Sequence, residues 1–300
     1  MFLGNTRKRN KDKTFGHEKM PKGKFLVYEF NKASEGKEAK ERKLEDIPTD
    51  QPTLLLIHGF NNEFKDVTKA YLEFEKTIRQ AGFQGNVIGF TWPSYGEMQK
   101  YFGDKEQVEY AAPALLNFVL KFRPLLKEKA LHVNTHSMGA HLLIRALTDY
   151  SCTEAIPEAQ PGTCLIDETT FFAADVSDDS LEKGEDGYHA VQEAKRLTSY
   201  FYSKDMVLGL SMIVNGDDRL GLHGAERPSR LPKNAFQVDC STLLDSHSGY
   251  RKNAKIMRDL SVVLNGRPSD EIDGRRPAGD KNTFRLGPAP EDSDSPGDDD

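Results

Sequence analysis

The chain alternates between short apolar runs and longer segments with helical periodicity. Continuous apolar runs at residues 53–57, 86–90 and 168–176 are typical of strands buried on both faces of a parallel sheet. Between these runs, residues 66–81 and 106–127 repeat apolar side chains three and four positions apart, which predicts helices. This alternation predicts an α/β fold, with a mostly parallel central sheet and helices on both faces.

The same pattern extends in both directions and stops near the ends of the chain. Further strands are expected at 24–30, 197–202 and 235–240, and further helices near 189–195, 206–213 and 250–264. Residues 1–22 are polar, basic and unperiodic, so we expect a flexible basic arm there. Residues 266–300 are rich in Pro, Gly, Asp and Arg, and such a composition predicts a disordered acidic tail. One folded domain should therefore cover residues 23–265.

The segment 131–149 has the pattern of a strand, a sharp turn and a helix. An apolar alternating run leads into THSMG (135–139), and apolar residues at helical spacing follow at once. A serine on such a turn is exposed, and the N-terminus of the next helix directs its free N–H groups at a developing oxyanion. We therefore interpret Ser137 as the nucleophile of an elbow. Thr135 replaces the first glycine of the usual G-x-S-x-G pattern.

Charge and composition narrow the class of protein. The formal net charge is −6. Residues 1–24 (+6) and 291–300 (−6) cancel, so the body is moderately acidic and gives no reason to expect nucleic acid as a partner. No apolar run approaches the roughly 18 residues of a membrane span, and no secretory signal peptide is recognisable. The three cysteines form no C-x-x-C pair, which also favours a cytoplasmic protein.

A serine nucleophile needs a base and a carboxylate that orients the base. In α/β-hydrolases the chain order is serine, acid, histidine, and the histidine follows the last strand. His247 has this position. Three other histidines follow the serine but lack it, namely His141, His189 and His223. Asp205 and Asp175 both end predicted strands; we favour Asp205 as the acid and keep Asp175 in reserve, whereas Asp245 is too close in sequence to His247.

The oxyanion of such a site needs two N–H donors. One should be the amide of Met138, directly after the serine, and the other should come from the loop after the strand at 53–57. Phe60 is the favoured second donor, with Gly59 or Asn61 as alternatives. Trp92 and Tyr95, after the strand at 86–90, are candidates for an apolar substrate wall. No dinucleotide, P-loop or zinc signature is present, so we expect neither a cofactor nor a metal.

Several of these segments together resemble a known family. They are HGFNNEF (58–64), FTWPS (90–94), THSMG (135–139), AADV (173–176), YFYSKDMVLGLS (200–211), RLG (219–221), and His247 with Tyr250. In this order they are similar to the α/β-hydrolases, most closely to a mainly bacterial group catalogued as domain of unknown function nine hundred. The resemblance covers roughly residues 50–260 and implies the α/β-hydrolase fold with a Ser-Asp-His site, but no substrate. Only about twenty residues separate two of the predicted strands after the elbow, so we expect no large cap domain.

These observations predict a serine hydrolase that cleaves a carboxylic ester, or a related acyl bond, of a small-molecule substrate. Ser137 would form an acyl-enzyme, His247 would move the protons and Asp205 would fix the imidazole. An acyltransferase or thioesterase would use the same residues. A non-catalytic binding module on the same fold is the alternative from another class, because folds host unrelated functions.

Overall fold

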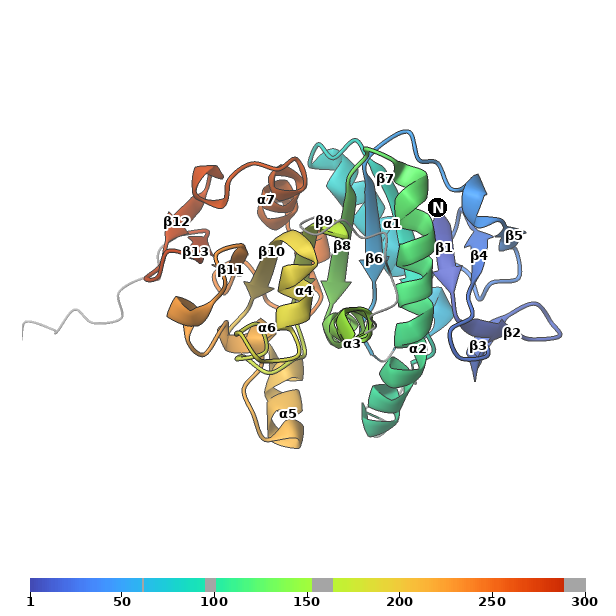
Figure 1. The fold of residues 1–300 in the computed structure, drawn as a ribbon, viewed down its shortest axis with the longest axis horizontal. Coiled ribbons are helices and arrows are strands. Elements are labelled where there is room, and N and C mark those ends of the chain that lie inside the picture. The colour runs from blue at the N-terminus through green and yellow to red at the C-terminus, as the bar shows by residue number, and fades with distance from the viewer. Residues whose placement is uncertain (61, 95–100, 153–163, 289–300) are drawn as a thin grey trace, which may run out of the picture.

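The computed structural model describes residues 1–60, 62–94, 101–152 and 164–288, and a single large sheet runs through it (Figure 1). Its eleven strands among these residues have the order β12-β13-β11-β10-β9-β8-β6-β7-β1-β4-β5. Their bounds are β1 Phe2–Asn5, β4 Leu26–Glu29, β5 Lys40–Arg42, β6 Thr53–Ile57, β7 Asn86–Thr91, β8 Leu131–His136, β9 Ile166–Phe172, β10 Ala194–Phe201, β11 Ala235–Asp239, β12 Arg275–Pro277 and β13 Thr283–Leu286. The strands from β13 to β1 in this order are parallel, and β12, β4 and β5 are antiparallel to their neighbours.

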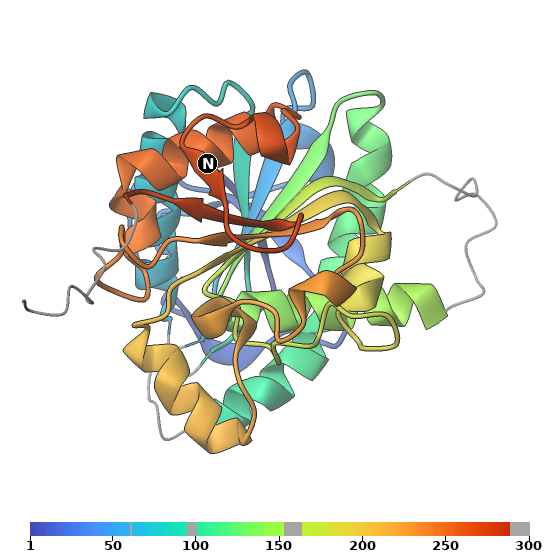
Figure 2. The same cartoon turned by 90° about the vertical axis from the view of Figure 1, so that its left-hand side faces the viewer.

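Helices cover both faces of the sheet (Figures 1 and 2). On one face lie α1 Phe64–Gln80 and α7 Ala254–Leu264, and on the other lie α2 Tyr101–Phe122, α3 Met138–Cys152 and α4 Tyr188–Gln192. Two further helices, α5 Met206–Asn215 and α6 Leu220–His223, follow β10. Short 3₁₀ turns complete the described elements at Leu44–Asp46, Arg123–Leu126, Pro228–Arg230, Gly249–Lys252 and Ser269–Glu271. The predicted α/β-hydrolase fold is confirmed.

Strand β6 shows why its sequence is apolar throughout. Leu55 and Ile57 belong to the core cluster between the sheet and helices α2 and α3. Leu54 and Leu56 point to the opposite face and pack with residues of α1 and α7. Because successive side chains of a strand alternate between faces, a strand covered on both sides must be apolar at every position.

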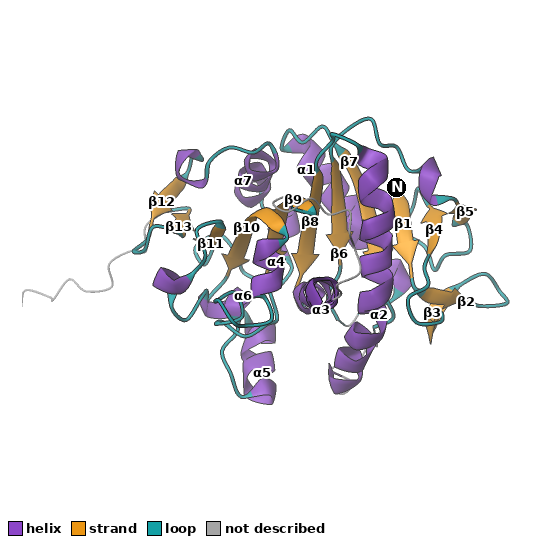
Figure 3. Cartoon of the chain, viewed as in Figure 1, coloured by secondary structure: helices purple, strands orange, loops and turns teal. Residues whose placement is uncertain are grey.

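The N-terminal segment differs from the expected flexible arm (Figure 3). Strand β1 lies inside the sheet, between β7 and β4, and the hairpin of β2 Arg7–Arg9 and β3 Phe15–Lys19 follows it. Leu3 and Phe15 are buried in the core, and Arg7 is 1% exposed. The buried apolar residues of this segment are few, and many lysines lie between them in the sequence. The hydropathy pattern therefore does not predict that the segment is folded.

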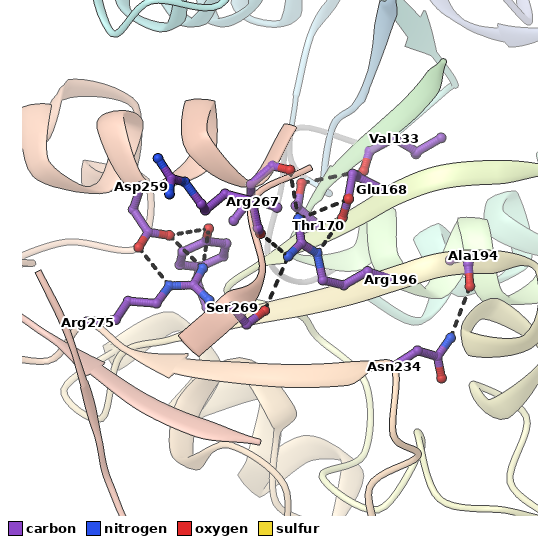
Figure 4. A network of polar contacts seen from close by, with 12 residues as sticks. Val133, Glu168, Thr170, Ala194, Arg196, Asn234, Asp259, Arg267, Ser269 and Arg275 are labelled. Atoms are coloured by element: carbon purple, nitrogen blue, oxygen red, sulfur yellow. Dashed lines mark hydrogen bonds and ion pairs between the residues drawn. The ribbon is translucent and has the colours of Figure 1, made fainter. Parts of the chain in front are cut away.

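The C-terminal segment also continues further than expected. Residues 275–277 and 283–286 form β12 and β13 at one edge of the sheet. Arg275 forms a bidentate ion pair with Asp259 of α7, at 2.7 Å for both hydrogen bonds, and both side chains are 1% exposed (Figure 4). A second buried pair, Arg196 with Glu168, joins β10 to β9 in the same region. The expected disordered tail is therefore wrong for residues 275–286, and residues 289–300 lie outside the described residues.

The connection that follows β9 is short. Residues 173–187 lead from β9 to α4 without a helix or a strand of the sheet, so no cap domain is inserted there. None of the described helices is long and apolar enough to cross a membrane.

Candidate active site

Ser137 occupies a sharp turn between a central strand and a helix. Strand β8 ends at the preceding residue and α3 begins at the following one. The backbone of Ser137 has a φ of 54°, a conformation that is uncommon for a residue other than glycine. A Cβ atom on Gly139 would lie 2.7 Å from the carbonyl oxygens of Ile57 and His58, so only glycine lets α3 approach β6 this closely. The local structure is that of a nucleophile elbow.

Asp205 and His247 are joined by a hydrogen bond. Asp205 is the N-cap of α5, where its Oδ1 accepts from the backbone N–H groups of Val207 and Leu208. Its other oxygen, Oδ2, accepts a hydrogen bond of 2.7 Å from Nδ1–H of His247. The Asp205 side chain is fully buried and that of His247 is 14% exposed. With the proton on Nδ1, the lone pair of neutral His247 is on Nε2.

Ser137 and His247 line the same cavity, which has a volume of about 250 Å³. Its walls come from the end of β6, from α1, from the elbow and from residues 247–251. Ser137 Oγ and His247 Nε2 are both buried and have no hydrogen-bond partner in the part of the chain that the structure describes. They are the two atoms between which a proton would move in a serine hydrolase. The hydrogen bond between serine and histidine in such sites is often long when no substrate is bound.

The loop after β6 is fixed against the elbow. A Cβ atom on Gly59 would lie 2.8 Å from Cβ of Ser137 and 3.0 Å from the carbonyl oxygen of His136. This glycine is therefore required by close approach. Asn62 Nδ2 donates to the carbonyl oxygens of Gly59 (3.2 Å) and Phe60 (2.6 Å), which holds the shape of the loop. The arrangement brings the segment with Phe60 to the serine, and Phe60 lines the cavity.

His58 has a structural part in this loop. Its Nε2 accepts a hydrogen bond from the backbone N–H of Trp92, so its proton is on Nδ1 and is donated to the carbonyl of Gly59. Burial, together with the nearby cation of Arg7, lowers the pKa of His58 to about 3. The imidazole is therefore neutral, and it stacks on the Trp92 ring at a centroid distance of 5.3 Å.

The reserve acid, Asp175, lies in a different environment. It is buried, accepts a hydrogen bond from Ser211 Oγ, and lies 3.6 Å from Nε of Arg219. It lines a second cavity, of about 400 Å³, together with His141. In the structure His247 pairs with Asp205 rather than with Asp175.

Trp92 and Tyr95 are the two residues expected to form a substrate wall. Trp92 is fully buried, and its Nε1–H donates to the carbonyl of His58, so the prediction that it forms a substrate wall is wrong. It is held inside because stacking and this hydrogen bond satisfy both its apolar ring and its donor.

Tyr95 lies outside the described residues. Met138, the expected oxyanion donor, directly follows Ser137 and has a buried side chain.

Three residues that line or support the site are assigned no role from the sequence. His136 and Tyr250 line the cavity, and burial raises the pKa of the Tyr250 hydroxyl to about 12. Arg7 reaches the loop after β6 from the N-terminal hairpin and donates to the carbonyl of Asn62 (2.7 Å) and to Thr91 Oγ1 (3.1 Å). The position of His136 beside the serine was a usable signal. Nothing in the sequence distinguishes Arg7 from its basic neighbours.

Comparison with known proteins gives matches of low sequence identity or short length. Among solved structures, XC6422 from Xanthomonas campestris, described as an a/b serine hydrolase without lid, is 13% identical with a TM-score of 0.40, over 81% of this chain and 86% of that chain. A lipase-esterase related protein from Clostridium acetobutylicum ATCC 824 is 11% identical with a TM-score of 0.39, over 73% and 96%. An uncharacterized protein, alr1448 of Nostoc sp., is 35% identical over 60 residues, and the chain spans only 16% of that protein's length.

A family model extends over most of the chain. It matches residues 34–254, from the segment before β5 to the first residue of α7, and so includes the elbow, Asp205 and His247. The chain therefore belongs to the family described as alpha/beta hydrolase of unknown function, DUF900.

Proposed function

We propose that this α/β hydrolase is a serine hydrolase that cleaves carboxylic esters through an acyl-enzyme. The observation that carries the proposal is the hydrogen bond from His247 to Asp205, together with a cavity that both His247 and Ser137 line. A buried carboxylate that fixes the tautomer of a histidine beside a serine is the arrangement that activates a hydroxyl.

The proposed reaction has two steps. In the first, Ser137 Oγ attacks the acyl carbon, and His247 Nε2 takes the hydroxyl proton. The ester C–O bond then breaks, and the leaving alcohol receives that proton, which leaves an acyl group on the serine. In the second step, water attacks the acyl carbon and gives a proton to His247. The acid is released when this proton returns to Ser137 Oγ.

Asp205 supports both steps by holding the imidazole. Its carboxylate is already fixed by two backbone N–H groups of α5, so it cannot turn away from His247 without losing its cap. When His247 gains a proton, the buried carboxylate stabilises the resulting imidazolium. The amides of Met138 and Phe60 are the proposed donors to the oxyanion, because elbow and loop are in close contact at Gly59.

The size of the cavity restricts the substrate. About 250 Å³ lies just below the roughly 300–1,000 Å³ of typical small-molecule sites. A short acyl group fits inside, whereas a long chain must extend beyond it. The proposed substrates are therefore esters with a short acyl group, or larger esters that are only partly enclosed.

Labelling with a fluorophosphonate probe tests the proposal. Wild type should be labelled, and Ser137→Ala and His247→Ala should not. Ser203→Ala, which changes an exposed serine outside the cavity, is the matched control and should be labelled like wild type. A correctly folded wild type that no probe labels would overturn the proposal and favour a binding module.

The choice of the acid is tested separately with an ester substrate. Asp205→Asn should lower kcat by up to about 10⁴-fold, because the amide stabilises the wrong tautomer and carries no charge. Asp175→Asn should lower it much less. The reverse order would show that the acid is Asp175.

A further inference from the structure

Helix α5 exposes an apolar stripe beside the candidate active site. Met206, Leu210, Ile213 and Val214 are 83%, 47%, 74% and 48% exposed, and they are the large apolar side chains with high exposure among the described residues. Their spacing of four, three and one positions places them on one outer side of the helix. Such grouping differs from the scattered exposed residues of ordinary surfaces and is typical of an interaction site.

The inner side of α5 is anchored, so the exposed stripe belongs to a fixed element. Leu208 packs on Ala173 and Leu222, and Asp205 caps the first turn. The helix contains no charged residue between Met206 and Asn215. A helix that is apolar on both sides is expected inside a core or against a membrane. Here one side packs on the protein and the other faces outward.

The stripe lies next to the mouth of the cavity. Asp205 immediately precedes the helix, and Val207 on its first turn lines the cavity that contains Ser137. Figures 1 and 2 both show α5 projecting from the side of the molecule at which the parallel strands end. A surface that covers α5 would therefore also lie over the entrance to the site.

A basic hairpin also leaves the sheet at the carboxyl end of the parallel strands, after β1, which lies five places from β10 in the strand order. Strand β1 is parallel to β7 and ends at Asn5, opposite Thr91, so the β2–β3 hairpin that follows leaves the sheet on the site side. Exposed lysines on it are Lys8, Lys11, Lys13 and Lys19, against the exposed acids Asp12 and Glu18. Lys8 pairs with Glu18, whereas Lys11 and Lys13 stand at the hairpin turn. Lys204, directly before Asp205, adds an exposed cation at the start of α5.

We propose that α5 and the turn of the β2–β3 hairpin dock on an anionic phospholipid surface. An apolar helix face enters the boundary between headgroups and acyl chains, and lysines elsewhere on the same side of the molecule attract anionic headgroups. A second copy of the chain fits the stripe less well. A helix of ten residues is about 15 Å long and roughly 10 Å wide, whereas a stable dimer buries about 800 Å² on each partner.

Co-sedimentation of the full chain with vesicles tests the docking. The protein should bind vesicles of phosphatidylcholine mixed with phosphatidylglycerol more tightly than vesicles of phosphatidylcholine alone. Leu210→Gln with Ile213→Gln should weaken binding to both at least about tenfold, since the apolar insertion is lost. Lys11→Glu with Lys13→Glu should weaken binding to the mixed vesicles on the order of tenfold or more and abolish their advantage.

A matched control reverses the charge of two lysines at the opposite end of the parallel strands. Lys129 and Lys233 are exposed and precede the amino ends of β8 and β11, so Lys129→Glu with Lys233→Glu changes the net charge equally but should bind like wild type. Thermal melting of each variant shows that it is folded. Equal weakening by this control would overturn the proposal, because it would show a dependence on net charge alone.

Three further outcomes are decisive. The proposal is overturned if wild type does not bind mixed vesicles. It is also overturned if the variant Leu210→Gln with Ile213→Gln binds as tightly as wild type. A concentration-dependent dimer that is lost in this variant would show that the stripe binds a second copy of the chain instead. The docking does not require catalysis and does not rest on the proposed function. Ser137→Ala should therefore bind vesicles as wild type does, so loss of labelling and loss of docking are separate results.

Discussion

The side chain of His136, directly before the elbow serine, donates a hydrogen bond of 3.1 Å from Nε2–H to the backbone carbonyl of His247. Burial and the neighbouring His247 hold the pKa of His136 well below its usual range, so it is a neutral donor. The two imidazole centroids are 4.6 Å apart, and the His136 ring also lies beside Tyr250. The turn that presents the proposed nucleophile thus positions the loop that presents the proposed base.

Replacing His136 separates this hydrogen bond from the ring packing. His136→Phe keeps an aromatic ring beside Tyr250 but removes the donor, which is worth about 1 kcal/mol. We expect kcat for an ester substrate to fall roughly fivefold to tenfold with an unchanged KM. His136→Gln, which restores a donor, should recover part of the loss. Steady-state kinetics check both variants, and an equal fall for Phe and Gln would show that the hydrogen bond is irrelevant.

Gly59 is expected to be intolerant of a methyl group. In Gly59→Ala the new Cβ would lie 2.8 Å from Cβ of Ser137, so either the elbow or the loop with Phe60 must move. Phe60 is the proposed second oxyanion donor, and loss of one such donor costs about 10²–10³ in kcat. Activity should therefore fall by this amount, with a loss of stability of about 1–3 kcal/mol. Kinetics and urea unfolding measure the two effects.

A matched control for this change is Gly209→Ala. Gly209 lies on α5, where a Cβ atom would meet nothing within 4 Å. Alanine has the higher helix propensity, by roughly 1 kcal/mol, so the control should be neutral or slightly more stable. If Gly59→Ala behaved in the same way, close contact between loop and elbow would not matter for the reaction.

The sequence predicts best those parts of the fold for which the environment of a segment determines its own pattern of residues. Strand β6 must be apolar at every position because both faces are covered, and it was predicted with its observed bounds. The pairing of Asp205 with His247 followed from their positions after successive strands. Arg7 could not be predicted, because its role depends on the carbonyl of Asn62, which is distant in sequence. Trp92 was misassigned because an aromatic residue after a strand has the same pattern whether it faces a cavity or stacks inside the core.

The buried pair of Arg275 and Asp259 makes the C-terminal segment part of the fold. Tyr200 also donates to Asp259 (2.6 Å), so Arg275→Met leaves a buried carboxylate with only a neutral donor. Removing one partner of such a pair costs about 3–5 kcal/mol. We expect this loss for Arg275→Met, and a smaller one for Arg275→Met with Asp259→Leu. Urea unfolding of the single and double variants gives the coupling energy.

An exposed pair provides the comparison. Lys8 and Glu18 are 2.9 Å apart, but their side chains are 63% and 68% exposed. Because water screens such pairs, Lys8→Met should leave the melting temperature close to that of wild type. If the losses of unfolding free energy for Arg275→Met and Asp259→Leu simply added in the double variant, the two side chains would not be coupled. The C-terminal segment would then not be held to the fold by this ion pair.

Acid should destabilise the protein through histidines that are buried in the neutral form. Burial lowers the pKa of His132, in β8, from its ordinary value of 6.5 to about 4. Between pH about 6.5 and about 4 the unfolded chain binds a proton at this histidine and the folded chain does not, so stability falls as the pH falls. His132→Leu should reduce the slope of the unfolding free energy by up to about 1.4 kcal/mol per pH unit in this window. Urea unfolding at a series of pH values measures the slope, with the exposed His223→Gln as control. A packing defect alone would shift the curve by a constant amount, so an unchanged slope in His132→Leu would show that His132 takes up its proton equally in the folded and the unfolded chain.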